Sequence, residues 1–414
     1  MERRQVVIIG AGPSGSAAAS FLHRTGIDCV VLDKIHFPRF VIGESLLPNC
    51  SEILADADLL SAVESEITFQ FKNGAAFSWG ERYAYFDFTK KFSPGRGTTY
   101  QVRRALFDKI LIDTVASRGV EVRFGDEVIG FLDAERGAIL TVKSENGETY
   151  QIQADFVLDA SGYGRVLPRL LNLEIPSDLP PREAHFTHID DNICDRAFDR
   201  QKILVTTHSK YRDVWIWLIP FVDNRCSIGV VGLPERFAEF ADDSEKILKS
   251  FVYECPMLAR ILKNSGWENE VPYRKIHGYS ANVSRLYGEN FALLGNASEF
   301  LDPVFSSGVT IALQSARMAA NLLIRQFAGE QVDWQKEFAE ELMVGVNAFR
   351  TYVCGWYDGV FQDVIYQENR SPEISEKISA ILAGYAWDKN NPLVEKSDRM
   401  LKALGEVIEK LQYR

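Results

Sequence analysis

VVIIGAGPSG, residues 6–15, joins an apolar run to three closely spaced glycines. The apolar run is typical of a buried strand, and a helical pattern follows the glycines. Between a strand and a helix, Gly10 permits a tight turn, Gly12 lets a phosphate group approach the backbone, and Gly15 lets the helix pack closely on the strand. The stretch therefore predicts a nucleotide-binding turn, with a glycine-rich turn that binds nothing as the alternative.

The residues around this turn favour a dinucleotide. The helix start, at Pro13 and Ser14, directs unpaired N–H groups and the positive end of the helix dipole toward a phosphate group. The next predicted strand, Cys29–Leu32, ends at Asp33, whose carboxylate is positioned to bind the hydroxyl pair of a ribose. An acid at this position makes the pattern more specific than its glycines alone.

Three later stretches bear on which dinucleotide binds. YQVRRALFD carries Gln101 and Arg104 at the start of a helix predicted over residues 103–118, where they could meet phosphates. DASG, residues 159–162, ends an apolar strand, as a second turn near the nucleotide would. LLGNASEFLDPVFSSGV closes another strand and leads into a helix that begins near Val309, whose N–H groups could face a flavin ring or an anion.

The stretch WIWLIP, residues 215–220, sets two indoles on one face of a predicted strand, because alternate residues of a strand share a face. Trp215 and Trp217 would lie on one side, stacked, and Ile216 and Leu218 on the other. One interpretation is a core strand buried on both sides and ended by Pro220. The other is a hydrophobic wall beside a reactive centre.

The length, net charge and cysteine content of the chain limit the functions it can have. A chain of 414 residues predicts two or three packed units, and its net charge of −11 argues against a nucleic-acid partner. We expect no membrane span, since no apolar run approaches about 18 residues. The six cysteines are scattered without metal-binding spacing, which predicts no metal site and a cytoplasmic protein with reduced thiols.

The chain ends in a predicted amphipathic helix within SDRMLKALGEVIEKLQYR. Leu401, Leu404, Ile408 and Leu411 would share one face of it. We interpret this segment as a helix docked on the protein rather than as a membrane anchor.

Five stretches together resemble the FAD-dependent monooxygenase superfamily that shares the aromatic hydroxylase fold: GAGPSG, IGESLLP, QVRRALFD, DASG and GNASEFLDPVFSSG. Within it, WIWLIP resembles the Trp-x-Trp-x-Ile-Pro signature of the flavin-dependent halogenases. DPVFSSGV resembles their phenol- and pyrrole-halogenating members, whereas tryptophan halogenases carry a glutamate where Phe305 stands. The resemblance covers roughly the first 330 residues.

The resemblance implies an α/β fold in which an FAD-binding Rossmann-like domain, of the GR2/aromatic hydroxylase type, is interleaved with a β-rich substrate domain. A helical C-terminal region follows. The expected domain ranges are 1–65, 96–172 and 280–330 for FAD binding, 66–95 and 173–279 for the substrate, and 331–414 for the helices.

Motifs and resemblance together predict the FAD contacts. Asn296 stands where the family usually carries an acid, and its amide can still bind a ribityl hydroxyl. The predicted contacts are Gly10, Gly12, Pro13, Ser14, Gly15, Asp33, Lys34, Arg39, Glu44, Ser45, Gln101, Arg104, Asp159, Ala160, Ser161, Gly162, Gly295, Asn296, Pro303, Gly308 and Val309.

The resemblance also implies the catalytic residues. Lys72 would receive hypohalous acid, Trp215 and Trp217 would keep the organic substrate off the flavin, and Ser307 and Gly308 would offer N–H groups to a halide or to the flavin. Each has a simpler interpretation. Lys72 could be a solvated lysine on an exposed strand face, and Ser307 and Gly308 could form an ordinary helix start.

The predicted function is a halogenase that uses reduced FAD, oxygen and halide on an electron-rich aromatic compound, either free or tethered to a carrier protein. Electrons would come from a separate flavin reductase or from NAD(P)H that docks transiently, because no second dinucleotide fingerprint is present. The alternatives are an FAD-dependent hydroxylase, a reductase of the geranylgeranyl-reductase type, and a flavin-binding protein that has lost its chemistry.

Overall fold

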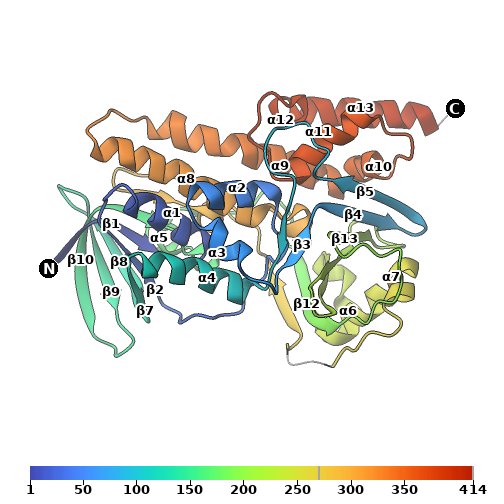
Figure 1. The fold of residues 1–414 in the computed structure, drawn as a ribbon, viewed down its shortest axis with the longest axis horizontal. Helices are drawn as coiled ribbons and strands as arrows, with labels where there is room; N and C mark the ends of the chain where they lie inside the picture. The colour runs from blue at the N-terminus through green and yellow to red at the C-terminus, as the bar shows by residue number, and fades with distance from the viewer. Residues whose placement is uncertain (269–270, 413–414) are drawn as a thin grey trace.

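Two seven-stranded sheets lie side by side, and a layer of C-terminal helices runs along one side of both (Figure 1). The computed structural model describes residues 1–268 and 271–412. Strands of the two sheets alternate along the chain, as the interleaved arrangement requires. The α/β class is confirmed, and the exact domain boundaries stay a prediction.

The first sheet has the strand order β7-β2-β1-β10-β9-β8, with β18 also paired to β10. Neighbours are parallel from β7 to β10 and at β18, whereas β8, β9 and β10 are antiparallel. The strands are β1 (Glu2–Ile9), β2 (Cys29–Asp33), β7 (Glu121–Phe124), β8 (Glu127–Asp133), β9 (Ala138–Lys143), β10 (Thr149–Asp159) and β18 (Phe291–Leu293).

Helices α1 (Pro13–His23), α4 (Arg104–Ser117) and α8 (Ser307–Phe327) pack beside this sheet (Figure 1). The strands predicted at the apolar run before Gly10 and from residue 29, and the helices predicted from residues 14, 103 and 309, are confirmed to within a few residues. The buried face of α4 is centred on Phe107, Leu111 and Val115.

The second sheet has the strand order β16-β12-β15-β14-β13-β4-β5, and only the β13–β4 pairing is parallel. Helices α6 (Ser244–Tyr253) and α7 (Pro256–Ile261) cover its outer face. The strands are β4 (Gly74–Trp79), β5 (Arg82–Asp87), β12 (Glu183–Asp190), β13 (Lys202–Thr207), β14 (Trp215–Pro220), β15 (Arg225–Gly232) and β16 (Arg274–His277).

Smaller elements connect the two sheets. Strand β3 (Gln70–Lys72) pairs with β6 (Thr99–Gln101), and β11 (Glu174–Ile175) pairs with β17 (Asn282–Val283). The short helices are α2 (Pro48–Asp56), α3 (Leu60–Glu64) and α5 (Val166–Leu170).

The C-terminal helices are α9 (Glu341–Tyr357), α10 (Val360–Ile365), α11 (Pro372–Leu382), α12 (Pro392–Glu395) and α13 (Ser397–Gln412). In α13, Leu401 and Ile408 are buried and Leu404 is half-buried, which confirms a docked helix, while the side chain of Leu411 lies outside the described residues. Among the described helices, none combines the length and the apolar character needed to cross a bilayer.

Burial divides the residues of β14 between two hydrophobic clusters. Trp215, Trp217 and Ile219 belong to the large cluster that joins the inner face of the second sheet to α1, α8 and the C-terminal helices. Ile216 and Leu218 belong to the cluster under α6 and α7. The predicted alternation of faces is confirmed, and the strand is buried on both sides.

Candidate active site

One continuous cavity runs from the carboxyl end of β1 to the inner face of β14. Its walls come from the ends of β1 and β2, segment 39–45, the turn after β10, the sheet face at β14 and the start of α8. Because parallel strands bring their carboxyl ends to one edge of a sheet, the motifs that are separated in sequence meet at this cavity.

The glycine turn leaves space that no larger residue could leave. Gly10 adopts a φ of +102°, and a Cβ there would lie 2.5 Å from the carbonyl oxygen of Ala160. Gly15 does not line the cavity, and a Cβ on it would lie 1.9 Å from the carbonyl oxygen of Gly10. The predicted reasons for glycine at these two positions, a tight turn and close helix packing, are confirmed.

Asp33 lies at the edge of the cavity with its carboxylate held by the backbone. Oδ2 accepts from Ala11 N and Oδ1 accepts from Ile35 N, both at 2.9 Å. A carboxylate has about four acceptor sites, so capacity for a ribose hydroxyl pair remains.

Two arginines converge on one buried carboxylate beside the turn. Arg104 donates to both oxygens of Asp108, at 2.8 and 3.0 Å, and Arg39 donates to Oδ2 at 3.3 Å. Both arginines line the cavity. A Cβ on Gly12 would lie 3.5 Å from Arg39 Nη2, so this guanidinium reaches the turn where a phosphate group would lie.

The start of α8 faces the cavity through Gly308 and Val309, directly after Ser306, which has a φ of +56°. Asp302 caps the short helical turn Pro303–Phe305 that precedes α8, because its Oδ1 accepts from Val304 N at 3.0 Å. Ser307 is buried but does not line the cavity. Backbone N–H groups at the start of a 21-residue helix can bind an anion or an electron-rich ring edge.

The residues present fit FAD. Ser14 Oγ and Glu44 Oε2 are buried and have no hydrogen-bond partner among the described residues, and both residues line the cavity. Buried polar atoms are nearly always paired, so these two atoms indicate a polar ligand. The other carboxylate oxygen of Glu44 lies 2.9 Å from His188 Nε2. A polar end at the glycine turn and an apolar end at β14 match the dinucleotide and ring ends of the cofactor.

The two indoles line the apolar end of this cavity. The ring centroids of Trp215 and Trp217 lie 5.9 Å apart, and the rings are tilted by 46° rather than stacked as predicted. Trp217 is held by its own sheet: Nε1 donates to Ser227 Oγ at 3.0 Å, and a Cβ on Gly229 would lie 2.3 Å from its ring. The core-strand interpretation is therefore confirmed and the two indoles also line the cavity, while their role as a wall beside a reactive centre stays a prediction.

Lys72 is fully buried, so the exposed-face alternative is wrong. Its Nζ donates to Ser45 Oγ and to the carbonyl oxygen of Leu46, both at 2.7 Å, and lies 5.5 Å from the centre of the Phe88 ring. Burial lowers the pKa of Lys72 to about 7, because the ammonium form loses its hydration. Lys72 does not line the cavity, but Ser45 does.

Most predicted residues meet at this one cavity. Those that line it are Gly10, Gly12, Pro13, Ser14, Asp33, Lys34, Arg39, Glu44, Ser45, Arg104, Ala160, Ser161, Gly162, Trp215, Trp217, Gly295, Asn296, Pro303, Gly308 and Val309.

Two further predicted contacts lie behind the lining. Asp159 holds the turn after β10, where its oxygens accept from Ser161 N at 2.9 Å and Leu167 N at 2.6 Å. Gln101 is buried, and its Nε2 donates to the carbonyl oxygen of Arg200 at 3.1 Å.

Several aromatic residues of the lining were not identified from the sequence. Phe186 lines the cavity beside Trp217, and Tyr163, Tyr279 and Phe300 line it near the start of α8, where the rings of Tyr163 and Tyr279 both contact Phe300. Phe300 lies within the quoted stretch GNASEFLDPVFSSG, and Tyr163 directly follows DASG, but neither was singled out. Phe186 and Tyr279 lie outside the quoted stretches, and only packing between distant segments brings them to the site.

Comparison with known proteins supports the same cofactor. The sequence pattern of the FAD binding domain family matches residues 3–334. Over 340 residues, the chain is 30% identical to the 1H-pyrrole-2-carbonyl-(peptidyl-carrier protein) chlorinase of Pseudomonas fluorescens. That match covers 77% of this chain and 75% of the chlorinase.

Two solved structures extend the likeness to the whole chain. A flavoprotein/dehydrogenase from Cytophaga hutchinsonii is 41% identical, with a TM-score of 0.94 and coverage of 99% of this chain and 100% of that one. A myxobacterial chondrochloren halogenase is 28% identical, with a TM-score of 0.75 and coverage of 99% and 97%.

Proposed function

This chain belongs to the flavin-dependent halogenases of the FAD-binding family, and we propose that it halogenates an electron-rich aromatic compound of the phenol or pyrrole type. The chain is an FAD-dependent oxidoreductase. When bound, reduced FAD would supply two electrons that reduce O₂ to the peroxide level, and a halide would give up the two further electrons that make hypohalous acid and water. The indoles of β14 would then keep the aromatic compound away from the flavin.

The observation that carries this proposal is the burial of Lys72 one hydrogen bond from the cavity. A single side chain, Ser45, lies between the cavity and the amine. With a pKa of about 7, the amine is partly neutral near neutral pH. A neutral amine attacks hypohalous acid, forms an N–halogen bond and releases water; transfer of the halogen to the aromatic ring then restores the amine.

The proposed cofactor contacts divide between two ends. Gly12, Arg39 and the start of α1 would hold the phosphates, and Asp33 would bind the ribose. Gly308 and the start of α8 would face the ring or a halide. The other predicted residues that line the cavity would complete this enclosure.

The substrate and the electron donor can be proposed more narrowly. The chlorinase of Pseudomonas fluorescens acts, by its name, on a pyrrole group carried by a peptidyl-carrier protein. By analogy, we propose that a carrier-tethered pyrrole or phenol is the first substrate to try. We also propose a separate flavin reductase, because the sequence contains a single dinucleotide fingerprint.

The test supplies the purified protein with chemically reduced FAD, O₂, chloride or bromide, and candidate phenols and pyrroles, both free and as carrier-bound thioesters. We expect mass spectrometry to show a halogenated product that requires halide. A hydroxylated product formed equally well without halide would contradict the proposal.

A second candidate is an oxidoreductase that works without halide. The Cytophaga relative, called a flavoprotein/dehydrogenase, has the higher identity of the two structures compared above. Rapid oxidation of NAD(P)H by the purified protein alone would favour this candidate and would argue against a separate reductase.

We also propose a cytoplasmic location. The six cysteines of the chain are free, which is consistent with a reducing compartment. Alkylation of the thiols in unreduced cell extract tests this, because disulfide-bonded cysteines would not react.

A further inference from the structure

A buried hydrogen-bond network ties one indole of the wall to the turn that begins α8. The hydroxyl of Tyr357, at the end of α9, accepts from Trp215 Nε1 at 2.9 Å and donates to Asp302 Oδ2 at 2.8 Å. Tyr279 OH donates to the same oxygen at 3.0 Å. One tyrosine of the C-terminal region thus joins β14 to the turn before α8.

Burial and charge make this network costly to loosen. Asp302 is 2% exposed, and burial raises the pKa of its carboxyl group, whereas hydrogen bonds from the two tyrosines act in the opposite direction. The guanidinium carbon of Arg182 lies 3.3 Å from the centre of the Tyr357 ring and supplies a nearby positive charge. Removing one donor would leave a buried carboxylate less well satisfied.

The two indoles differ in what holds them. Trp217 bonds to Ser227 of the adjacent strand of its own sheet. Trp215 instead bonds to Tyr357, which lies outside that sheet and beyond residues 3–334, the part matched by the FAD binding domain. The position of Trp215 therefore depends on the C-terminal helices.

We propose that Tyr357 is a positioning residue which, together with Asp302, fixes Trp215 so that the wall keeps organic molecules out of the flavin cavity. The inference rests on the proposed function. Tyr357 acts on the reaction only through Trp215 and the turn before α8.

A loosened wall predicts a change in products rather than a simple loss of activity. Halogenation consumes reduced FAD, O₂, halide, a proton and the aromatic compound, and yields oxidised FAD, the halogenated product and two waters. Two competing outcomes use no halide: reduced FAD and O₂ give oxidised FAD and H₂O₂, or with the aromatic compound they give oxidised FAD, a hydroxylated product and water. A wall that admits water or substrate favours these two outcomes.

The experiment compares Tyr357→Phe with Tyr352→Phe. Both residues lie on α9, where Tyr352 is buried and Tyr357 is half-buried, but the Tyr352 hydroxyl donates to the carbonyl oxygen of Leu393 at 2.6 Å, outside this network. With phenol as the probe substrate, we expect H₂O₂ plus hydroxylated product per FAD oxidised to rise about three- to tenfold in Tyr357→Phe. Tyr352→Phe should keep the wild-type ratio.

A second variant tests the inference if Tyr357→Phe fails to fold. Asp302→Asn removes the charge and leaves one oxygen where the carboxylate has two, so it cannot accept from Val304 N and from the two tyrosines as Asp302 does, and it should raise the same ratio. If either variant binds FAD at the wild-type level and leaves the ratio unchanged, the inference is wrong. If the wild type makes no halogenated product, H₂O₂ and hydroxylated product already account for all the FAD oxidised, and the quantity to compare is then the hydroxylated product formed per H₂O₂. A wall that admits phenol should raise this second ratio in Tyr357→Phe, so failure of the proposed function and failure of this inference give different results.

Discussion

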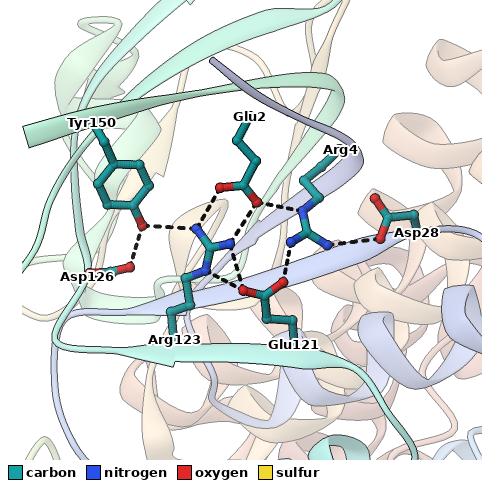
Figure 2. Close-up of polar contacts among 7 residues, drawn as sticks. All are labelled: Glu2, Arg4, Asp28, Glu121, Arg123, Asp126 and Tyr150. Atoms are coloured by element: carbon teal, nitrogen blue, oxygen red, sulfur yellow. Dashed lines mark hydrogen bonds and ion pairs between the residues drawn. The ribbon is translucent and has the colours of Figure 1, made fainter.

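The two ends of the first sheet use similar polar residues in opposite ways. At the amino ends of β1 and β7, Glu2, Arg4, Glu121 and Arg123 bind one another and Asp28 (Figure 2). Arg4 donates to Glu2 at 2.7 Å and to Asp28 at 3.1 Å, and Arg123 pairs with Glu2 at 2.7 Å and with Glu121 at 2.6 Å. Each charged group of this network has a partner of opposite sign.

At the carboxyl ends, polar atoms are left unpaired. Within the part of the chain that the structure describes, Ser14 Oγ and Glu44 Oε2 are buried without partners, and Gly10 leaves space beside the backbone. Paired charges at the amino ends of the strands stabilise the sheet, whereas the unpaired polar atoms at the carboxyl ends are available to bind a ligand. Unpaired buried polar atoms therefore mark the binding end of the sheet, where they lie beside paired groups such as Asp33 and Arg104.

The largest effect should be on FAD affinity, from filling the space at the glycine turn after β1. Gly10→Ala would place a Cβ 2.5 Å from the carbonyl oxygen of Ala160 at a φ of +102°, so the turn must move away from the phosphates. We expect FAD binding to weaken by about 3 kcal/mol, roughly a hundredfold in Kd. Flavin absorbance and fluorescence titration of the purified protein measure it.

Gly26→Ala is the matched control, because Gly26 also has a positive φ, +79°, but a Cβ added there would have no atom within 4 Å. It should cost about 1 kcal/mol of stability and leave FAD affinity unchanged. Equal FAD loss in both variants would mean that backbone strain, rather than the open turn, controls binding.

The next effect concerns the buried amine beside the cavity. Lys72→Met keeps the length of the side chain but removes Nζ, and we expect the rate of halogenation to fall about a hundredfold or more while FAD stays bound. Product mass spectrometry and the flavin spectrum measure the two quantities. Lys202→Met is the control, since Lys202 is also buried but donates to Asn73 and Asp199 away from the cavity. Equal losses in both variants would argue against a chemical role for Lys72.

Local patterns account for what the sequence could predict. The strand–turn–helix around Gly10 and the alternating faces around Trp215 depend on residues that are neighbours in the chain, so periodicity and turn chemistry were enough. Asp33 was recognisable for the same reason, because the apolar run of the second strand leads directly into the acid.

Contacts between residues far apart in the chain account for what the sequence could not predict. Lys72 follows a strand-like pattern that is equally typical of an exposed face; its burial depends on pairing with β6 and on cover from Ser45, Leu46 and Phe88. The tilt of the indoles and the contact of Tyr357 with Trp215 likewise arise between segments that are far apart in sequence. No single-sequence pattern encodes these contacts.

A smaller effect follows from the pKa of Lys72. Burial lowers this pKa from 10.5 to about 7, so between those pH values the unfolded chain holds a proton that the folded protein has released. The free energy of unfolding contributed by this group therefore rises with pH through that window. Relative to Lys72→Met, the wild type should gain about 2 kcal/mol between pH 7 and pH 9 in urea unfolding. A constant difference would mean that the folded protein keeps the amine protonated.

The smallest effect should be on stability, from the ion pairs at the amino ends of β1 and β7. The hydrogen bond from Arg123 is the largest cause that lowers the pKa of Glu2 from 4.5 to about 2, so its stabilisation is present above pH 4.5 and is lost as the pH falls toward 2. Because these side chains are partly exposed, Glu2→Gln should cost at most about 1 kcal/mol at pH 7 and nothing near pH 2.

Arg3→Met serves as the control, since Arg3 pairs with Asp155 at 3.0 Å but its side chain is 62% exposed, and we expect almost no change in thermal unfolding. FAD affinity should be unaffected in both variants. If Glu2→Gln weakened FAD binding as well as stability, the amino-end network would have to support the position of β1 and its glycine turn. The two ends of the sheet would then be coupled, and the division between a structural end and a binding end would no longer hold.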